Sequence, residues 1–239
     1  MWWIILISIL VPAISVGTFV VLIIISKIKH QHGDYNDGGG IHIGTHQRVS
    51  FFIPVNDRAG IVGEKRVNYH LRPLLRNDEY LLTNLLLPLR NGEDTEIDCV
   101  LISRKGIFCI ETKNWVGHIS GNDKDKYWLH RYDDLYLKHK WHVNPVRQNN
   151  WHCTILKEKL NNHYWINNIV IFYRQEYGRR INSKYIYSVR KFRDYYRSLD
   201  SNVIPENSLK VIYQKLKPYV ATFEELEKHR ERIKRKYND

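Results

Sequence analysis

Three ionisable side chains interrupt apolar segments that otherwise resemble buried strands. Asp98 lies within the run Thr95–Ile102, while Glu111 falls within the run Ile107–Thr112 and Lys113 directly follows it. Burying an unpaired charge is costly, so each of these groups must be paired or bound to a metal ion. Because side chains alternate along a strand with a period of two, Glu111 and Lys113 lie on the same face of theirs.

The four residues that separate the two runs, 103–106, are typical of a β-hairpin turn. A two-residue turn there places Asp98 directly opposite Glu111 on the neighbouring strand. A bulge at Gly106 would shift the pairing by one residue and place Asp98 opposite Thr112. The chemistry favours the first register, because it brings the two carboxylates together.

Two adjacent carboxylates repel each other unless a cation lies between them. Hard oxygen ligands with open coordination positions suit Mg²⁺ or Mn²⁺ rather than zinc. A metal ion held by Asp98 and Glu111 would activate water and stabilise the charge of a phosphoryl transition state. Lys113 would orient that water or stabilise the developing charge. The alternative is a buried ion pair of the lysine with the two acids, without catalysis.

The elements that must position these residues alternate between helix and strand. Hydrophobic spacing predicts a helix over Gly63–Leu75, with Glu64 in its first turn and Pro73 bending or ending it. The other expected elements are a strand over Glu79–Leu87, a helix over Asn144–Leu160 that starts near Pro145, a strand over Ile166–Tyr173 and a charged helix over Glu224–Lys236. This order predicts an α/β domain with a mixed central sheet flanked by helices.

The N-terminus predicts a membrane anchor. Residues 2–25 carry no charge and, as a helix, are long enough to cross the hydrocarbon core of a bilayer. A cleavable signal peptide fits less well, because a basic leading segment and a small-residue cleavage site are missing. We therefore expect one transmembrane helix within 1–30 and a flexible, glycine-rich linker over 31–50. Positive charge follows the span, so the C-terminal bulk is expected in the cytoplasm.

Charge is unevenly distributed along the chain. The 239 residues carry a formal net charge of +12, and the segment 151–239 alone has 19 Lys and Arg against 10 Asp and Glu. Residues 176–239 form a basic, tyrosine-rich extension whose field suits a polyanion, either nucleic acid or an anionic membrane. Three cysteines without a Cys-x-x-Cys pair exclude a disulfide-stapled protein and a cysteine-rich zinc site, and they fit a reducing compartment.

Several short motifs occur together in a specific order. They are Gly63-Glu64-Lys65-Arg66-Val67, Thr95-Glu96-Ile97-Asp98, Gly106-Ile107-Phe108-Cys109-Ile110-Glu111-Thr112-Lys113-Asn114, Gly117-His118-Ile119-Ser120-Gly121, Trp128 and Asn144-Pro145-Val146-Arg147-Gln148. In this order they resemble the nuclease-related domain (NERD), a branch of the PD-(D/E)xK nuclease superfamily. The resemblance runs over roughly residues 60–160, under half of the chain, and we assign residues 51–175 to this domain.

The resemblance implies a restriction-endonuclease-like core and metal-dependent cleavage of phosphodiester bonds. It implies that Asp98 and Glu111 bind the metal and that Lys113 is the catalytic lysine. Glu64 matches an additional acid on the first helix, and Gln148 matches a polar residue on the next helix. Cys99, where the family often has His, and Trp128 are interpreted as core residues.

The sequence therefore predicts a membrane-anchored, Mg²⁺-dependent nuclease at the cytoplasmic face, with DNA favoured over RNA as its substrate. A second hypothesis keeps the fold but not the chemistry, as a membrane-tethered module that binds nucleic acid or protein. A third gives the basic surface the lesser role of contacting anionic lipid.

Overall fold

A computed structural model of the protein describes residues 55–132, 139–174, 179–181 and 183–238. The predicted membrane anchor (1–30) and linker (31–50) lie outside these described residues. Within the described part of the chain, none of the helices combines the length and apolar character needed to cross a bilayer. Residues 54–239 form one compact unit.

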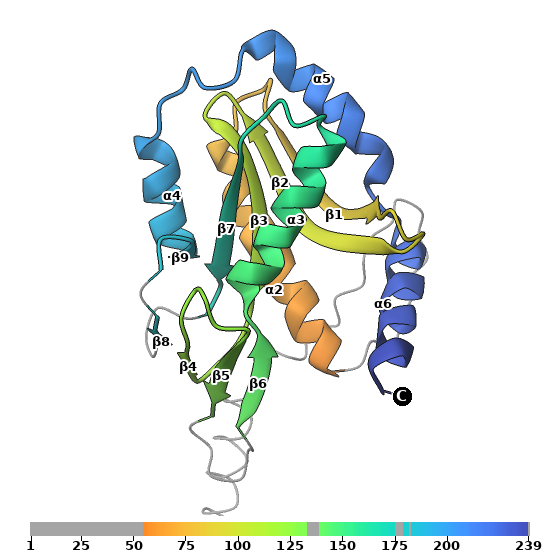
Figure 1. Cartoon of the computed structure of the whole chain (residues 1–239). Coiled ribbons are helices and arrows are strands. Elements are labelled where there is room, and N and C mark those ends of the chain that lie inside the picture. Colours follow the sequence, from red (N-terminus) through yellow and green to blue (C-terminus); the bar gives the residue numbers. More distant parts are fainter. Residues whose placement is uncertain (1–54, 133–138, 175–178, 182, 239) are drawn as a thin grey trace, which may run out of the picture. The chain divides into compact units, whose positions relative to one another are not determined.

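A five-stranded mixed sheet forms the centre of this unit (Figure 1). Its strands, in spatial order, are β1 (Tyr80–Pro88), β2 (Asp94–Ser103), β3 (Gly106–Lys113), β7 (Ile166–Phe172) and β9 (Ile186–Ser188). The first three strands pair antiparallel, whereas β7 runs parallel to both β3 and β9. The predicted mixed sheet is confirmed, and β2 and β3 occupy its interior, as their two-sided apolar sequences require.

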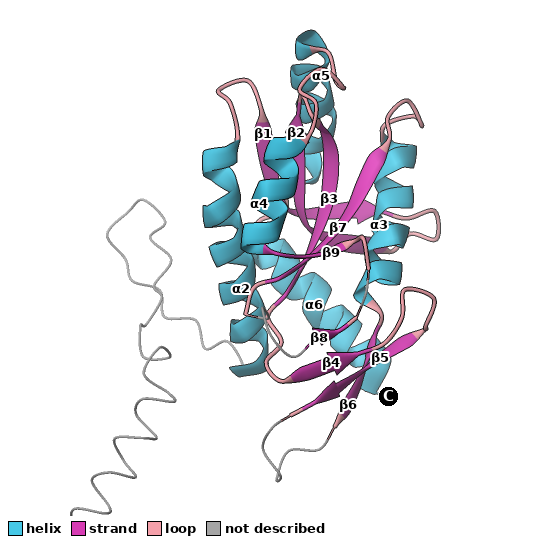
Figure 2. Cartoon of the chain, turned by 90° about the vertical axis from the view of Figure 1, so that its left-hand side faces the viewer, coloured by secondary structure: helices cyan, strands magenta, loops and turns pink. Residues whose placement is uncertain are grey.

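Helices cover both faces of the sheet (Figure 2). One face packs against α2 (Val55–Leu71) and α4 (Val189–Ser198), and its core includes Val67, Phe108 and Phe192. The other face packs against α3 (Pro145–Lys159) and α5 (Glu206–Leu216), through residues such as Leu156 and Leu209. The result is a three-layer α/β/α arrangement, in which each sheet face is buried by its own pair of helices.

The first helix differs from its predicted limits. It begins at Val55, eight residues before the expected start at Gly63, and it ends at Leu71. The sequence did not predict this start because residues 55–62 lack the apolar spacing that is typical of the buried part of the helix. Pro73 ends the α-helix as predicted, within the 3₁₀ turn η1 (Arg72–Leu74), since proline cannot continue the hydrogen-bond pattern.

Helix α3 is fixed at its start and through its buried face. The side chain of Asn144 caps the helix by accepting hydrogen bonds from the backbone N–H groups of Val146 and Arg147, and Pro145 takes the first position. One turn further on, the fully buried Asn149 donates hydrogen bonds to the carbonyl oxygens of Cys109 on β3 (2.9 Å) and Ile169 on β7 (3.0 Å). These bonds connect α3 to the two central parallel strands.

A second, four-stranded sheet was not expected from the sequence. Its order is β6 (Lys140–Val143), β5 (Tyr127–Arg131), β4 (His118–Ser120) and β8 (Arg179–Arg180). Trp128 on β5 is completely buried, so its predicted role in the core is confirmed. Its indole N–H donates to the carbonyl of Asn122, which satisfies the polar end of a buried ring. These strands are too short to stand out from the sequence.

The C-terminal helix α6 (Phe223–Asn238) is attached to the sheet mainly by charge. His229 and Arg232 both contact the carboxylate of Asp94 at the start of β2, and Lys236 lies 2.6 Å from Glu93. The predicted charged helix over 224–236 is confirmed. These ion pairs show how a helix with few apolar residues is held in place.

The interior bonds of Asn149 lead to a test of stability. We expect Asn149→Ala to lower the free energy of unfolding by about 2–3 kcal/mol, because buried carbonyls on β3 and β7 would lose their donor. Asn150→Ala provides the matched control, since this neighbouring side chain is exposed and the change should stay within about 0.5 kcal/mol. Urea denaturation followed by circular dichroism measures both. Equal stabilities of the two variants would contradict this role of Asn149.

Candidate active site

The predicted carboxylates lie in the middle of β2 and near the end of β3. Ser103 pairs with Gly106 and Cys99 with Ile110, so the hairpin has a two-residue turn without a bulge. The predicted register is therefore confirmed. Continued by one residue, it brings Asp98 opposite Glu111.

Strand alternation places the charged groups on the face of the sheet that α3 covers. Val100 and Cys109 pack in the core on that face, and Asp98 and Glu111 each lie two positions away along the same strand. Opposite Asp98, β1 is distorted, because Asn84 has a positive φ of 58° between the regular pairs on either side. Asp98 is partly exposed, as are Asp94 and Glu96 on the same face of β2, whereas the adjacent residues are buried.

A short ion pair joins the last two charged residues of β3. The Nζ atom of Lys113 lies 2.5 Å from Oε1 of Glu111, whose side chain is only 3% exposed. The same Nζ atom donates to Oε1 of Gln148 at 3.4 Å. The structure thus brings together Glu111, Lys113 and Gln148, three of the five residues predicted for the site.

The other two predicted residues line a cavity of about 790 Å³ next to this group. Asp98 and Glu64 contribute to its wall, together with Gln148. Oδ2 of Asp98 accepts a hydrogen bond from the backbone N–H of Thr112 (2.8 Å), which fixes that carboxylate against β3. All five side chains named from the sequence therefore occupy one region, shared by α2, β2, β3 and α3.

This environment raises the pKa of two of the three carboxylates and lowers the pKa of the third. Burial raises the pKa of Asp98 well above its ordinary value, and the negative charges of Glu111 and Glu64 add to the rise. Burial likewise raises the pKa of Glu64 to about 7, with Glu96 and Glu111 adding to the effect and Arg230 opposing it. Burial alone would also raise the pKa of Glu111, but Lys113 and His152 outweigh it and lower the pKa to about 2.

Sequence reasoning missed His152, which belongs to the same group. Its Nδ1 atom lies 3.5 Å from Oε2 of Glu111, and the His152 side chain is only 4% exposed. Neither of these two buried atoms has a hydrogen-bond partner among the described residues. His152 follows Gln148 by four residues on α3, so helical spacing gave a signal for it.

Sequence reasoning also missed Arg230, which reaches the cavity from α6. Its guanidinium lies 2.5 Å from Glu96 and 3.9 Å from Glu64. Arg230 lies more than a hundred residues after β2 in the sequence, so no local spacing could have indicated its contact with the cavity.

The donors in this region fit a hard divalent cation. Asp98 and Glu111 supply carboxylate oxygens, and Oε2 of Glu111 is buried with no hydrogen-bond partner among the described residues. Across those residues, no three His, Cys, Asp or Glu side chains converge closely enough to enclose a metal ion. Mg²⁺ does not require such a cage, because it commonly binds one or two carboxylates and keeps several waters.

A mixed sheet with an Asp and a Glu-x-Lys on adjacent central strands, beside a Gln on the following helix, is typical of the PD-(D/E)xK superfamily. Residues 59–173 match the family model of the nuclease-related domain, and this part of the chain is a nuclease-related domain.

A curated relative is similar to most of the chain. It is an uncharacterized protein from Bacillus anthracis, 29% identical over 159 residues that cover 63% of this chain and 72% of the relative. No solved structure matches the chain.

The raised pKa of Glu64 predicts a change in how stability depends on pH. A carboxyl whose pKa is about 7 when folded and 4.5 when unfolded stabilises the fold at low pH, and this contribution is lost as pH rises to about 7. Without metal, raising the pH from 5 to 8 should lower the free energy of unfolding of the parent by about 2 kcal/mol more than that of Glu64→Gln. Thermal melting across this range measures the difference.

The control for this experiment is Glu231→Gln, which changes a glutamate that is 63% exposed on α6. Its melting temperatures should follow those of the parent at every pH. Parallel curves for Glu64→Gln and the parent would contradict the assigned environment of Glu64.

Proposed function

We propose that the protein is a divalent-metal-dependent nuclease that hydrolyses phosphodiester bonds in nucleic acid. The observation that carries this proposal is the convergence of Asp98, Glu111 and Lys113 on the adjacent strands β2 and β3. Glu111 is held ionised by Lys113, so it remains a metal ligand over the whole physiological pH range. Membership of residues 59–173 in the nuclease-related domain family supports the same chemistry.

Each side chain has a distinct proposed role. Asp98 and Glu111 would hold Mg²⁺ or Mn²⁺, which, when bound, supplies a Lewis acid and lowers the pKa of water. Lys113 stabilises negative charge that develops on the phosphate. Gln148 accepts a hydrogen bond from Lys113 and so positions its amine. Glu64, whose pKa is near neutral, is placed to accept or release a proton at the wall of the cavity.

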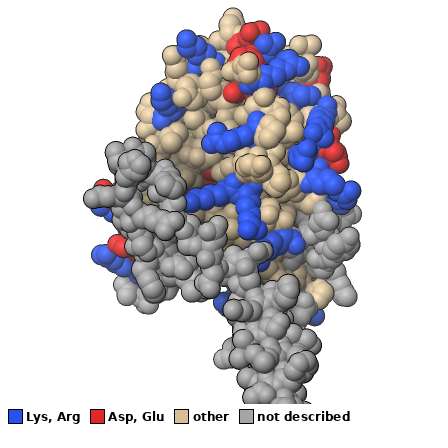
Figure 3. Space-filling model, turned by 180° about the vertical axis from the view of Figure 1, so that it is seen from behind, with Lys and Arg blue, Asp and Glu red and all other residues tan. Residues whose placement is uncertain are grey.

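The alternative of a binding module without catalysis has its own support. Seen from behind, the molecule shows many Lys and Arg side chains and few acidic ones (Figure 3). This is the face formed by α2 and α4, whose exposed cations include Lys65, Arg190 and Lys191. Such a surface binds polyanions by releasing counterions, without any need for a catalytic site.

Substitution of a proposed metal ligand separates the two functions. We expect Asp98→Asn to abolish Mg²⁺-dependent cleavage of plasmid and single-stranded substrates. It should also abolish the rise in melting temperature that Mg²⁺ produces in the parent, because one ligand is lost. Lys113→Ala should slow cleavage by about 10²–10⁴-fold, and it should also weaken the thermal response to Mg²⁺, because Glu111 loses the amine that holds it ionised.

The control variant is Asp194→Asn, which alters an exposed acid on α4 and should behave like the parent. Nucleic-acid binding without any cleavage by the parent, in either Mg²⁺ or Mn²⁺, would favour the binding module. Cleavage by Asp98→Asn at the parental rate would eliminate the proposed site.

We also propose that residues 1–30 anchor the protein in a membrane with the nuclease-related domain in the cytoplasm. The support is the uncharged segment 2–25 with Trp2 and Trp3 at one end and Lys27 and Lys29 beyond the other.

The anchor is tested by fractionation. We expect the full chain to stay in the membrane pellet after carbonate extraction, because a spanning helix is released only by detergent. A chain lacking residues 2–25 should move to the supernatant. A C-terminal reporter that is active only in the cytoplasm gives the orientation. Release of the full chain by carbonate, or an inactive reporter, would refute this part of the proposal.

A further inference from the structure

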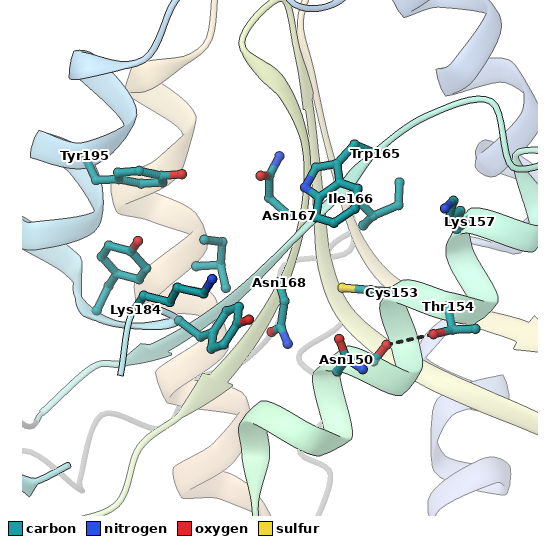
Figure 4. Close-up of a pocket in the computed structure, with 13 residues that line it drawn as sticks. Asn150, Cys153, Thr154, Lys157, Trp165, Ile166, Asn167, Asn168, Lys184 and Tyr195 are labelled. Atoms are coloured by element: carbon teal, nitrogen blue, oxygen red, sulfur yellow. Dashed lines mark hydrogen bonds between the residues drawn. The ribbon is translucent and has the colours of Figure 1, made fainter. Parts of the chain in front are cut away.

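A second hollow lies on the opposite side of α3 from the catalytic cavity. Strand β9 pairs only with Val170–Phe172, so the first half of β7 has no strand on its outer side among the described residues. A depression of about 400 Å³ occupies this position (Figure 4). Tyr195 of α4 and Lys184 border it on one side, α3 on the other, and Asn167 and Asn168 of β7 lie between them.

This depression continues toward the catalytic cavity. A neighbouring depression of about 440 Å³ shares Asn150, Asn168 and Tyr185 with it. The second depression in turn shares Trp151 with the cavity that contains Asp98. The two depressions and Trp151 thus form one path around the exposed side of α3, which we call the α3 track. It ends at the cavity whose wall includes Asp98.

Aromatic and basic side chains line the α3 track. The aromatic residues are Trp151, Trp165, Tyr185, Tyr187 and Tyr195, and the basic residues are Lys124, Arg147, Lys157 and Lys184. Among the described residues that line the two depressions, Asp123 is the single acidic one. The track therefore carries positive charge, whereas the cavity at its end carries carboxylates.

Two of these aromatic rings are unusually accessible. Trp165 is 76% exposed and Trp151 is 45% exposed, although both are large apolar side chains. Neither position is needed to fill the core, and exposed tryptophans that border a groove often contact ligands. Tyr187 and Tyr195 stack on each other at 5.1 Å, and Lys184 lies 5.2 Å from the ring of Tyr185. Flat rings and cations thus lie close together in the α3 track.

We propose that the α3 track binds a single-stranded polynucleotide and leads it to the catalytic cavity. Unpaired bases stack on the tryptophan and tyrosine rings, and the phosphates lie against the lysines and Arg147. Duplex bases are already stacked on one another, so a duplex gains only the contacts to phosphate. This inference rests on the proposed nuclease function and specifies its substrate class.

Binding in EDTA tests the track without cleavage. Fluorescence anisotropy measures the Kd of the full chain for a labelled oligothymidylate of about 15 nucleotides, near the upper end of the roughly 4–16 nucleotides that a single-strand-binding domain covers. We expect Trp165→Ala and Lys184→Ala each to weaken binding by about five- to tenfold. Lys184→Ala should also reduce the number of counterions released on binding by about one, measured from the dependence of the Kd on salt concentration.

Matched controls lie outside the track. Trp141→Ala removes a tryptophan that is 67% exposed on β6, and Lys210→Ala removes an exposed lysine on α5. Both should bind like the parent. A duplex of the same length should bind more weakly than the single strand, and Trp165→Ala should leave its Kd unchanged. Thermal melting verifies that each variant is folded.

Parental affinity in Trp165→Ala and Lys184→Ala would overturn the proposal, as would duplex binding equal to that of the single strand. Asp98→Asn keeps this outcome separate from the catalytic proposal. If Asp98→Asn stops cleavage while the track variants bind normally, the nuclease stands and the track fails. If the parent never cleaves but the track variants lose single-strand binding, the track stands and the nuclease fails.

Discussion

The buried ion pair between Glu111 and Lys113 is the interaction on which the site depends. A carboxylate that is 3% exposed would normally become protonated, because burial penalises its charge. An amine 2.5 Å away reverses that preference and holds Glu111 ionised. Burial raises the pKa values of Asp98 and Glu64, and the negative charge of Glu111 adds to the rise. A cation placed between these acids would lower their pKa values again, because it stabilises their charged forms.

Helix α3 connects this site to the rest of the molecule. Asn149 on its buried side bonds to β3 and β7, and Gln148 and His152 on an adjacent side approach the charged pair. Its exposed side carries Trp151 and the α3 track. Because α3 is bonded to the core strands, it holds the site side chains that it carries in fixed positions, and catalysis requires such a fixed geometry.

Residues beyond the family match complete both the core and the site. Phe192 and Leu209, from α4 and α5, are fully buried on opposite faces of the sheet. From α6, Arg230 binds Glu96 and approaches Glu64, so it offsets part of the negative charge around the cavity. The C-terminal helices are therefore integral to the folded unit.

The sequence by itself determined local features, which are the shared face of Glu111 and Lys113 and the Asn144–Pro145 start of α3. It narrowed the hairpin to two registers, and the structure shows the one that the chemistry favoured. Turn length and strand periodicity govern these, and both act over a few residues. The early start of α2, the second sheet and the approach of Arg230 were decided by tertiary structure. Each depends on packing or charge pairing between segments far apart in the chain, which local spacing does not encode. His152 lies between these cases, because its helical position was readable while its contact with Glu111 was not.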